Sequence, residues 1–258
     1  MARFARDGFL VVPRVFPTSA VAQLSAAFGR LVELARDPDA PTGTARFVTD
    51  PGDPPRIHRV VWCAGADPTL DRLGRHPRLV AIAAQLLDSP LLDQLISQAH
   101  FKHPGDGVAF PWHQDSAHRR HGTPAWTDVD GRGSFVELAL AIDPVGPDNG
   151  PLRFLPGSHR AGPRPYEPDT RTLAPEHVDP RGAVAPALMP GDLVAFGAFT
   201  VHGSEANTSD RPRRMFLNGF ALPGANHRPY PGAGLGRRVV LDARRPPASA
   251  PPAVKLAG

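Results

Sequence analysis

The apolar residues of this chain change their spacing near Leu92, and this change restricts the folds open to the sequence. Before Leu92 they recur every three or four residues, as in helices packed on one side. After it they alternate with polar residues, as in strands with one buried face. The 32 prolines and 25 glycines among 258 residues mark many turns, which suits a β-rich fold better than a helical bundle. We expect a mainly β fold with flanking helices.

Two amphipathic helices are predicted in the N-terminal part, over residues 18–36 and 77–88. Thr18 or Ser19 is suited to cap the first helix, because a hydroxyl accepts a hydrogen bond from a free backbone N–H group. The stretch 37–55 between the helices is rich in Pro, Gly, Asp and Thr. We interpret it as an irregular loop.

The clearest predicted strand covers residues 135–143, with Glu137 on the face opposite to the apolar side chains. Asn149-Gly150 predicts a tight turn of the hairpin type, and 152–155 a returning strand. Other strands are expected at 92–102, 193–196 and 213–222. The Pro-rich stretch 161–186 is long for a connection, so it is either a functional lid or mobile loop or a disordered surface insertion.

Composition argues against several classes of partner. Lys and Arg exceed Asp and Glu by 29 to 25, and the basic residues are scattered, so no nucleic-acid partner is implied. No stretch approaches the roughly 20 apolar residues that cross a bilayer, and the N-terminus is unlike a signal peptide. Cys63 is the only cysteine, so no disulfide is expected. We expect a cytoplasmic protein with no membrane partner.

A candidate metal site begins at His113 and Asp115. In an extended chain, residues i and i+2 point to the same side, so these two side chains can bind one metal ion from a single strand end. His202 is a third candidate ligand far downstream. Two imidazoles and one carboxylate form the ligand set of non-haem Fe(II) oxygenases. Taken singly, each residue also fits a polar position in a strand or turn.

An ordered set of motifs covers most of the chain, from Arg6-Asp7-Gly8-Phe9 to the run that ends at Arg214. Its main members are Trp112-His113-Gln114-Asp115, Asp148-Asn149-Gly150, Pro156-Gly157-Ser158-His159-Arg160, Pro190-Gly191-Asp192 and His202-Gly203-Ser204. The set resembles the phytanoyl-CoA dioxygenase family of Fe(II)/2-oxoglutarate oxygenases. The resemblance implies a double-stranded β-helix, a cupin-like jelly roll with helices packed outside.

With this fold, we expect one catalytic domain over residues 1–243. A helical buttress would cover about 17–90 and the jelly-roll core about 92–222. Residues 244–258 have the composition of a flexible tail.

The resemblance assigns His113, Asp115 and His202 as iron ligands. It matches Arg213 to the family arginine that pairs with the distal carboxylate of 2-oxoglutarate, a task for which the guanidinium fork is suited. Adjacent strand residues face opposite sides, so Arg213 and Arg214 cannot both point inward. A solvated surface arginine is the other interpretation.

Further contacts with 2-oxoglutarate are expected from Ser204, Gln98 and Lys102. Ser204 alternatively satisfies a turn. Gln98 and Lys102 share a predicted strand face with His100, whose role stays open. A polar inner face fits a barrel lined with co-substrate contacts.

The implied activity is that of a dioxygenase using Fe(II), 2-oxoglutarate and O2 to hydroxylate an unactivated C–H bond of a small molecule, for example in secondary metabolism. Family members that halogenate have Gly or Ala at the position of Asp115, so its carboxylate favours hydroxylation. Desaturation, epoxidation and ring rearrangement are alternatives on the same site. A non-oxidative cupin-like metal enzyme, a zinc hydrolase and a jelly-roll binding protein are the rivals from other classes.

The substrate is not specified by the sequence. A loop after the metal pair carries basic and aromatic residues, namely His118, Arg119, Arg120, His121 and Trp126. They would suit a polar or anionic substrate group at the mouth of the site, or they form a solvated basic loop. No dedicated coenzyme A site is recognisable.

Overall fold

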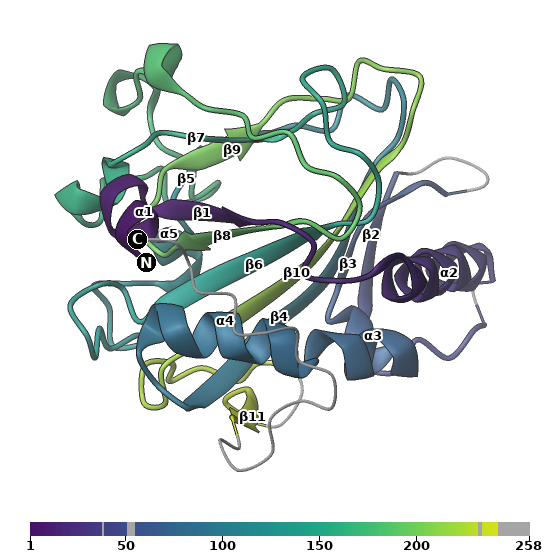
Figure 1. The fold of residues 1–258 in the computed structure, drawn as a ribbon, viewed down its shortest axis with the longest axis horizontal. Helices are drawn as coiled ribbons and strands as arrows, with labels where there is room; N and C mark the ends of the chain where they lie inside the picture. The colour runs from purple at the N-terminus through teal and green to yellow at the C-terminus, as the bar shows by residue number, and fades with distance from the viewer. Residues whose placement is uncertain (38, 51–54, 232–233, 242–258) are drawn as a thin grey trace.

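Two antiparallel β-sheets form the body of the protein in the computed structural model, which describes residues 1–37, 39–50, 55–231 and 234–241 (Figure 1). The larger sheet has the order β1-β8-β6-β10-β4-β3-β2, with β11 also paired to β4, and the smaller has the order β5-β9-β7. The strands are β1 Phe9–Val12, β2 Arg46–Thr49, β3 Ile57–Val61, β4 Leu91–Lys102, β5 Phe110–His113, β6 Phe135–Ala141, β7 Leu152–Phe154, β8 Leu193–Gly197, β9 His202–Ser204, β10 Arg213–Ala221 and β11 Arg237–Val240. The predicted mainly β jelly roll with flanking helices is confirmed.

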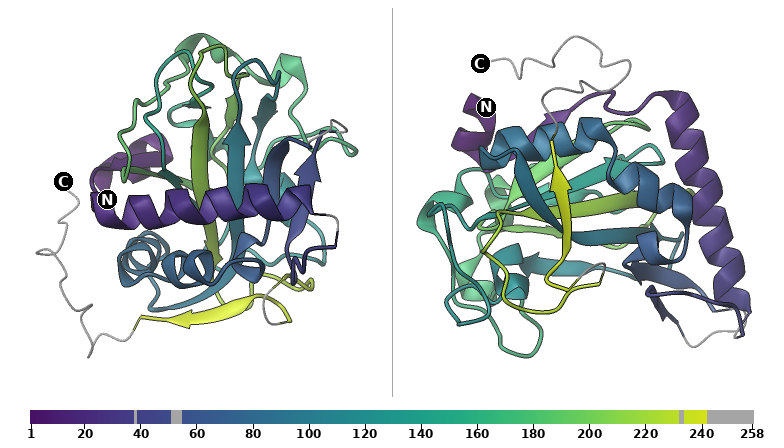
Figure 2. Two further views of the ribbon diagram at one scale, coloured as in Figure 1. Left: turned by 90° about the vertical axis from the view of Figure 1, so that its right-hand side faces the viewer. Right: turned by 90° about the horizontal axis from the view of Figure 1, so that it is seen from below.

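The described residues form five α-helices, three of which cover the outer face of the larger sheet. They are α1 Ala2–Asp7, α2 Thr18–Arg36, α3 Pro68–Gly74, α4 Pro77–Leu87 and α5 Asp115–Arg119, with short 3-10 turns η1 Cys63–Gly65, η2 Ser158–Ala161, η3 Pro175–His177 and η4 Pro180–Gly182. Figure 1 shows α2, α3 and α4 away from the smaller sheet of β5, β7 and β9, and Figure 2 shows these helices from two further sides. Phe28 of α2 lies fully buried against Phe101 and Phe216 of the sheet, with ring centroids 5.0 and 6.5 Å away.

The larger sheet is buried on both faces around β6. Val136, Leu138 and Leu140 face the core shared with the helices, as the sequence predicts. Ala139 and Ala141 belong to a second core between the two sheets. Glu137 lies on that same inter-sheet side, because side chains alternate along a strand. Glu137, the one polar side chain of β6, therefore lies in the space between the two sheets.

Both predicted helices are confirmed, but the predicted cap of the first is wrong. Pro17, in extended conformation, occupies the N-cap of α2, and no side chain accepts a capping hydrogen bond there. Thr18 is already the first helical residue. At α4, the ring Nδ1 atom of His76 accepts a hydrogen bond from the Arg78 N–H group, and Pro77 occupies the first helical position.

The predicted irregular loop over 37–55 is wrong in part, because Arg46–Thr49 forms β2 and pairs with β3. The sheet also extends beyond the expected 92–222 core, since β1, β2, β3 and β11 lie outside that range. These strands have four or five residues each, too few for their alternation to stand out. The predicted tail 244–258 lies outside the described residues.

The connection after β6 does not form the predicted hairpin. Gly150 has a positive φ of 73°, so a turn is present, but β7 pairs with β9 in the smaller sheet and not with β6. The chain crosses from one sheet to the other at this point. Arg211 forms an ion pair with Asp148 in this connection, at 2.9 Å.

The stretch 161–186 is irregular, with η3 and η4 as its regular turns. The Leu173 N–H group donates to the Trp112 carbonyl at 2.8 Å, and Leu173 is buried. Thr170, Arg171 and Thr172 line the cavity described below. This stretch therefore forms part of the wall of the cavity, and the alternative of a disordered insertion is wrong.

Across the described ranges, no helix is both long enough and apolar enough to span a membrane.

Candidate metal centre and co-substrate pocket

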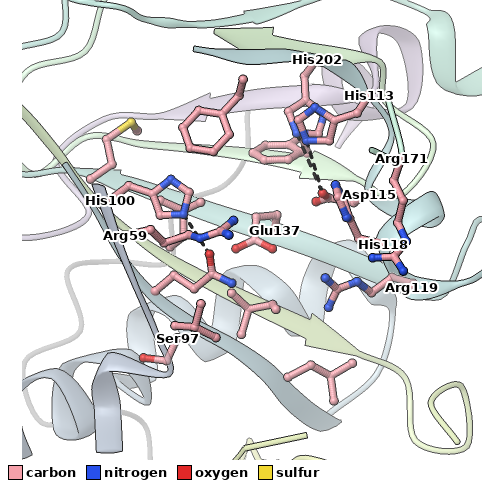
Figure 3. Close-up of a pocket in the computed structure, with 18 of the residues that line it drawn as sticks. Arg59, Ser97, His100, His113, Asp115, His118, Arg119, Glu137, Arg171 and His202 are labelled. Carbon is pink, nitrogen blue, oxygen red and sulfur yellow. Dashed lines mark hydrogen bonds and ion pairs between the residues drawn. The ribbon is translucent and has the colours of Figure 1, made fainter. Parts of the chain in front are cut away.

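Three potential metal ligands converge between the two sheets (Figure 3). His113 ends β5 and pairs in register with His202 of β9, and their ring centroids lie 4.2 Å apart. Asp115 Oδ1 lies 3.9 Å from His113 Nε2 and 4.0 Å from His202 Nε2. Asp115 does not share the strand of His113, contrary to the single-strand expectation, because it begins α5 after the extended residue Gln114.

Backbone carbonyls orient both imidazoles. His113 Nδ1 lies 2.7 Å from the Pro111 oxygen, and His202 Nδ1 lies 2.9 Å from the Thr200 oxygen. A carbonyl only accepts, so each Nδ1 carries the proton and donates. Each Nε2 atom is then unprotonated and faces Asp115 with a lone pair that can bind a metal ion. This is the arrangement found in metal-binding histidines.

The electrostatics of the cluster favour the metal-binding protonation states of His202 and Asp115. Burial, and then His113, lower the pKa of His202 to about 4, so its imidazole is neutral at neutral pH. Burial disfavours the Asp115 carboxylate, but His202 and His113 outweigh it and lower the pKa of Asp115.

The three residues fit a first-row metal ion. Nitrogen and oxygen ligands sit about 2.1 Å from such ions, so two ligands of one ion are at most about 4.2 Å apart. The separations from Asp115 are 3.9 and 4.0 Å, and all three ligand atoms lie within 4.8 Å of one another, so small side-chain movements bring them onto one ion. A set of two imidazoles and one carboxylate is the ligand set of non-haem iron sites.

Gln114 lies between His113 and Asp115, and its side chain binds three backbone groups that are distant in sequence. Its buried side chain donates to the Phe199 and Gly162 carbonyls at 2.6 and 3.0 Å and accepts from the Arg164 N–H group at 2.8 Å. All three contacts reach loops distant in sequence, so the turn between β5 and α5 is held on several sides.

Arg213 points inward and Arg214 outward, as the alternation predicts. Arg213 is 2% exposed, lines the cavity, and donates to the Gly150 carbonyl at 2.7 Å. Burial lowers the pKa of Arg213 to about 10, so the guanidinium stays charged at neutral pH. Arg214 instead pairs with Asp143 at 2.8 Å, and Arg211 is the surface arginine.

Lys102 and Ser204 lie beside Arg213. Lys102 pairs in register with Arg213, and its Nζ donates to Ser204 Oγ at 2.8 Å and to the Glu205 carbonyl. Burial, and then Arg213, lower the pKa of Lys102 to about 7. The structure thus brings two buried cationic side chains and one hydroxyl together at this part of the site.

Gln98 and His100 line the cavity from β4. Gln98 Oε1 lies 2.8 Å from His100 Nε2, and the His100 ring stacks on Phe110 with centroids 5.4 Å apart. The predicted polar face of β4 is therefore present. Which of these side chains touches 2-oxoglutarate stays a prediction.

The metal cluster and Arg213 share one cavity of about 500 Å³. His118 and Arg119 also line it, as one interpretation of the basic loop predicts. The other members of that loop point elsewhere: His121 pairs with Asp128 at 3.4 Å, and Trp126 donates to the Gly133 carbonyl at 3.2 Å. Arg120 is exposed.

Sequence reasoning missed Glu137 and Arg59 as lining residues of the cavity. Glu137 is 5% exposed, and burial, and then Asp115, raise its pKa well above the usual range. The available signal was a carboxylate within an otherwise apolar strand. For Arg59 the missing information was strand β3 itself.

The Pro-Gly-Ser-His-Arg motif has structural contacts. Ser158 Oγ accepts from the Val201 N–H group at 2.9 Å. His159 and Arg160 contact the carbonyls of Ala5 and Arg6, which docks α1. The motif therefore fastens the N-terminus near the strand that leads to His202.

Comparison with protein families gives a match to the model described as phytanoyl-CoA dioxygenase over residues 4–215. An ectoine dioxygenase of Sphingopyxis alaskensis is 30% identical over 96% of this chain and 83% of its own length. An L-proline trans-4-hydroxylase of Streptomyces griseoviridis is 30% identical over 83% of this chain and 82% of its own. These matches confirm the resemblance that the motifs indicate.

Solved structures agree with this placement. EctD from S. alaskensis, solved with 2-oxoglutarate and 5-hydroxyectoine, superposes with a TM-score of 0.72 at 26% identity, covering 93% of this chain and 83% of that one. EctD with bound Fe gives a TM-score of 0.66 at 29% identity, covering 85% and 74%.

Proposed function

We propose, from the premise that this chain belongs to the phytanoyl-CoA dioxygenase family, that it hydroxylates an unactivated C–H bond of a small molecule. The reaction takes one O2 and one 2-oxoglutarate and releases succinate and CO2, with one oxygen atom entering the substrate. Asp115 occupies the position that a halide would need, which favours hydroxylation over halogenation.

The single observation that carries the proposal is the shared cavity. Three candidate metal-binding side chains lie in it together with the buried Arg213. A guanidinium stays protonated at neutral pH, so Arg213 does not act as an acid or base there. A non-oxidative metal enzyme or zinc hydrolase would need the metal ligands but not a buried guanidinium beside them. A co-substrate with a free carboxylate explains both.

In this proposal His113, Asp115 and His202 hold Fe(II), which with bound 2-oxoglutarate supplies the oxidation of the C–H bond by O2. Arg213 binds the distal carboxylate of 2-oxoglutarate, with Lys102 adding positive charge and Ser204 a hydroxyl. Gln98 is a further polar contact on the same face. The protein contributes position and a pocket shielded from water.

Two relatives act on small polar molecules, as their names state: ectoine and L-proline. A small-molecule substrate for this chain agrees with the cavity volume of about 500 Å³, which has to accommodate 2-oxoglutarate as well. We further propose that residues 1–243 form a single domain. The cytoplasm is the proposed location, because the sole cysteine is a buried thiol.

An anaerobic titration tests the proposal. Adding Fe(II) and then 2-oxoglutarate to the purified protein should produce the visible charge-transfer band of a chelated keto acid. His202→Ala should abolish the band, and Arg211→Ala, at an exposed ion pair, should keep it. A wild-type protein without the band would support a zinc hydrolase or a binding protein instead. With substrate, one oxygen atom from ¹⁸O2 in the product separates hydroxylation from desaturation.

A further inference from the structure

Two buried ionisable side chains, one acidic and one basic, line the cavity, and each has polar atoms without a hydrogen-bond partner. Glu137 of β6 is 5% exposed, and its Oε1 atom has no hydrogen-bond partner. Arg119 of α5 is 8% exposed, and its Nε and Nη1 atoms have none. Figure 3 shows the carboxylate and the guanidinium directed into the same space, near Asp115.

These groups do not neutralise each other directly. Among the described residues, neither Glu137 nor Arg119 has an ion-pair partner within 4.0 Å, although exposed pairs such as Arg211 and Asp148 do. Buried ionisable groups with unsatisfied polar atoms are unfavourable in a fold and are found most often at functional sites, where a ligand supplies the missing contacts. Both groups are therefore candidates to contact a bound molecule.

The surrounding structure keeps both groups in place. The Arg119 guanidinium lies 5.0 Å from the Phe135 ring and 5.4 Å from the Tyr230 ring. Such contacts hold a guanidinium over aromatic faces and leave its N–H edge free. At Gly219, a Cβ atom would lie 2.8 Å from Glu137 Oε2, so the glycine leaves the room that the carboxylate occupies.

The distal carboxylate of 2-oxoglutarate already has Arg213 in the proposed function, so Arg119 is available for a second anion. A guanidinium fork matches a carboxylate bidentately. When it is ionised, the Glu137 carboxylate can accept hydrogen bonds but cannot donate them. The matching ligand group therefore has N–H donors and a positive charge.

We propose that the substrate is a zwitterion, a small molecule with one carboxylate bound by Arg119 and one ammonium or amidinium group bound by Glu137. This inference rests on the proposed function and names the substrate class for the same site. The cavity of about 500 Å³ has to hold both co-substrate and substrate, which limits the substrate to a small molecule.

The test is a panel of defined zwitterions, the twenty common L-amino acids and ectoine, each paired with its carboxamide and its N-acetyl derivative where these exist. Succinate release above the substrate-free level is measured with the Fe(II)- and 2-oxoglutarate-loaded protein. At least one zwitterion should stimulate release, and blocking either charge should lower kcat/KM by about 100-fold.

Two variants assign the contacts separately. Arg119→Gln should erase the preference for the acid over its carboxamide and keep the preference for the free amine. Glu137→Gln should erase the preference for the free amine and keep the preference for the acid. A role of either residue in folding alone would not produce these opposite selectivities. Arg120→Gln, at the exposed neighbouring position, should behave as the wild type.

The outcomes distinguish the inference from the proposed function. No keto-acid absorption band with Fe(II) would overturn both. A normal band combined with equal stimulation by parent and blocked compounds, or with no zwitterion that stimulates, would overturn the zwitterion inference alone. Loss of both preferences in each variant would also contradict it, because the two contacts would then not be separate.

Discussion

Two backbone carbonyls orient the histidines of the candidate metal centre. The Pro111 and Thr200 oxygens fix the tautomers of His113 and His202, each at two positions before the imidazole. A ligand prepared in this way loses little conformational freedom when metal binds. The side chain identity is readable in the sequence, but the carbonyl partner depends on the local path of the backbone.

Arg213 should dominate the affinity for 2-oxoglutarate. We expect Arg213→Ala to raise the Kd for 2-oxoglutarate by at least about 30-fold, because truncating one partner of a buried charge pair costs about 2–5 kcal/mol. Titration of the keto-acid band at fixed Fe(II) measures this. Arg211→Ala is the matched control with an unchanged Kd, since Arg211 pairs with Asp148 at the surface. Equal Kd values for the two variants would reject the role of Arg213.

The affinity for 2-oxoglutarate should fall as pH rises above neutrality. The pKa of Lys102 is about 7 in the free protein, and a bound dicarboxylate favours the protonated amine. Binding above pH 7 therefore requires proton uptake, and the Kd should rise by about tenfold between pH 7 and 8.5. Lys102→Met should bind more weakly at pH 7 and show a flatter dependence. The same slope in both proteins would place the titration elsewhere.

Sequence reasoning identified the metal-ligand candidates and the inward arginine, and the structure brings them into one cavity. Residue type and order were enough to select His113, Asp115, His202 and Arg213 as candidates. Glu137 was seen only as the opposite face of a strand. Its place in the cavity depends on which sheet lies across from β6, and that long-range arrangement is not encoded in local alternation.

At the scale of elements, the connection between β6 and β7 joins the sheets and shapes the co-substrate pocket. A Cβ atom at Gly150 would lie 2.7 Å from the Glu205 carbonyl and 2.8 Å from Lys102 Cδ. The Gly150 carbonyl also accepts from Arg213. The Asn-Gly pair predicts the turn correctly, but turn chemistry does not specify which strand the chain pairs with next.

Gly150→Ala should affect stability and co-substrate binding together. The positive φ of 73° is unfavourable for alanine, and the added methyl group meets backbone. We expect a loss of about 1–3 kcal/mol in the free energy of unfolding, with a higher Kd for 2-oxoglutarate. Urea unfolding and the band titration measure the two effects. Gly146→Ala, in the same connection with its nearest neighbour at 3.3 Å, should change stability by less than about 0.5 kcal/mol.

At the scale of the whole molecule, the larger sheet separates two cores. The helices pack on one side of it, and the cavity opens on the other. Hydrophobic periodicity predicted α2 and α4 well, because their apolar stripes are long. It missed β1, β2, β3 and β11, which have only four or five residues each.

This separation predicts a stability change with little effect on chemistry. Phe28→Ala removes a fully buried ring from the helix side and should lower the free energy of unfolding by about 3–5 kcal/mol. At a temperature where the variant stays folded, kcat/KM should remain within about threefold of the wild type. Glu33→Ala on the exposed side of α2 is the control, with a change below about 0.5 kcal/mol. A large loss of kcat/KM in folded Phe28→Ala would show that the two sides are coupled.

The attachment of the stretch 161–186 at Gln114 and Trp112 has a consequence for redesign. Gly162, Arg164 and Leu173 form its hydrogen bonds to the segment that carries two of the candidate metal ligands. Thr170 to Thr172 line the cavity. Grafting a foreign sequence between Arg164 and Leu173 would exchange part of the substrate wall without disturbing the strand that ends at His113. Selectivity and oxidative chemistry are in this sense modular within one small enzyme.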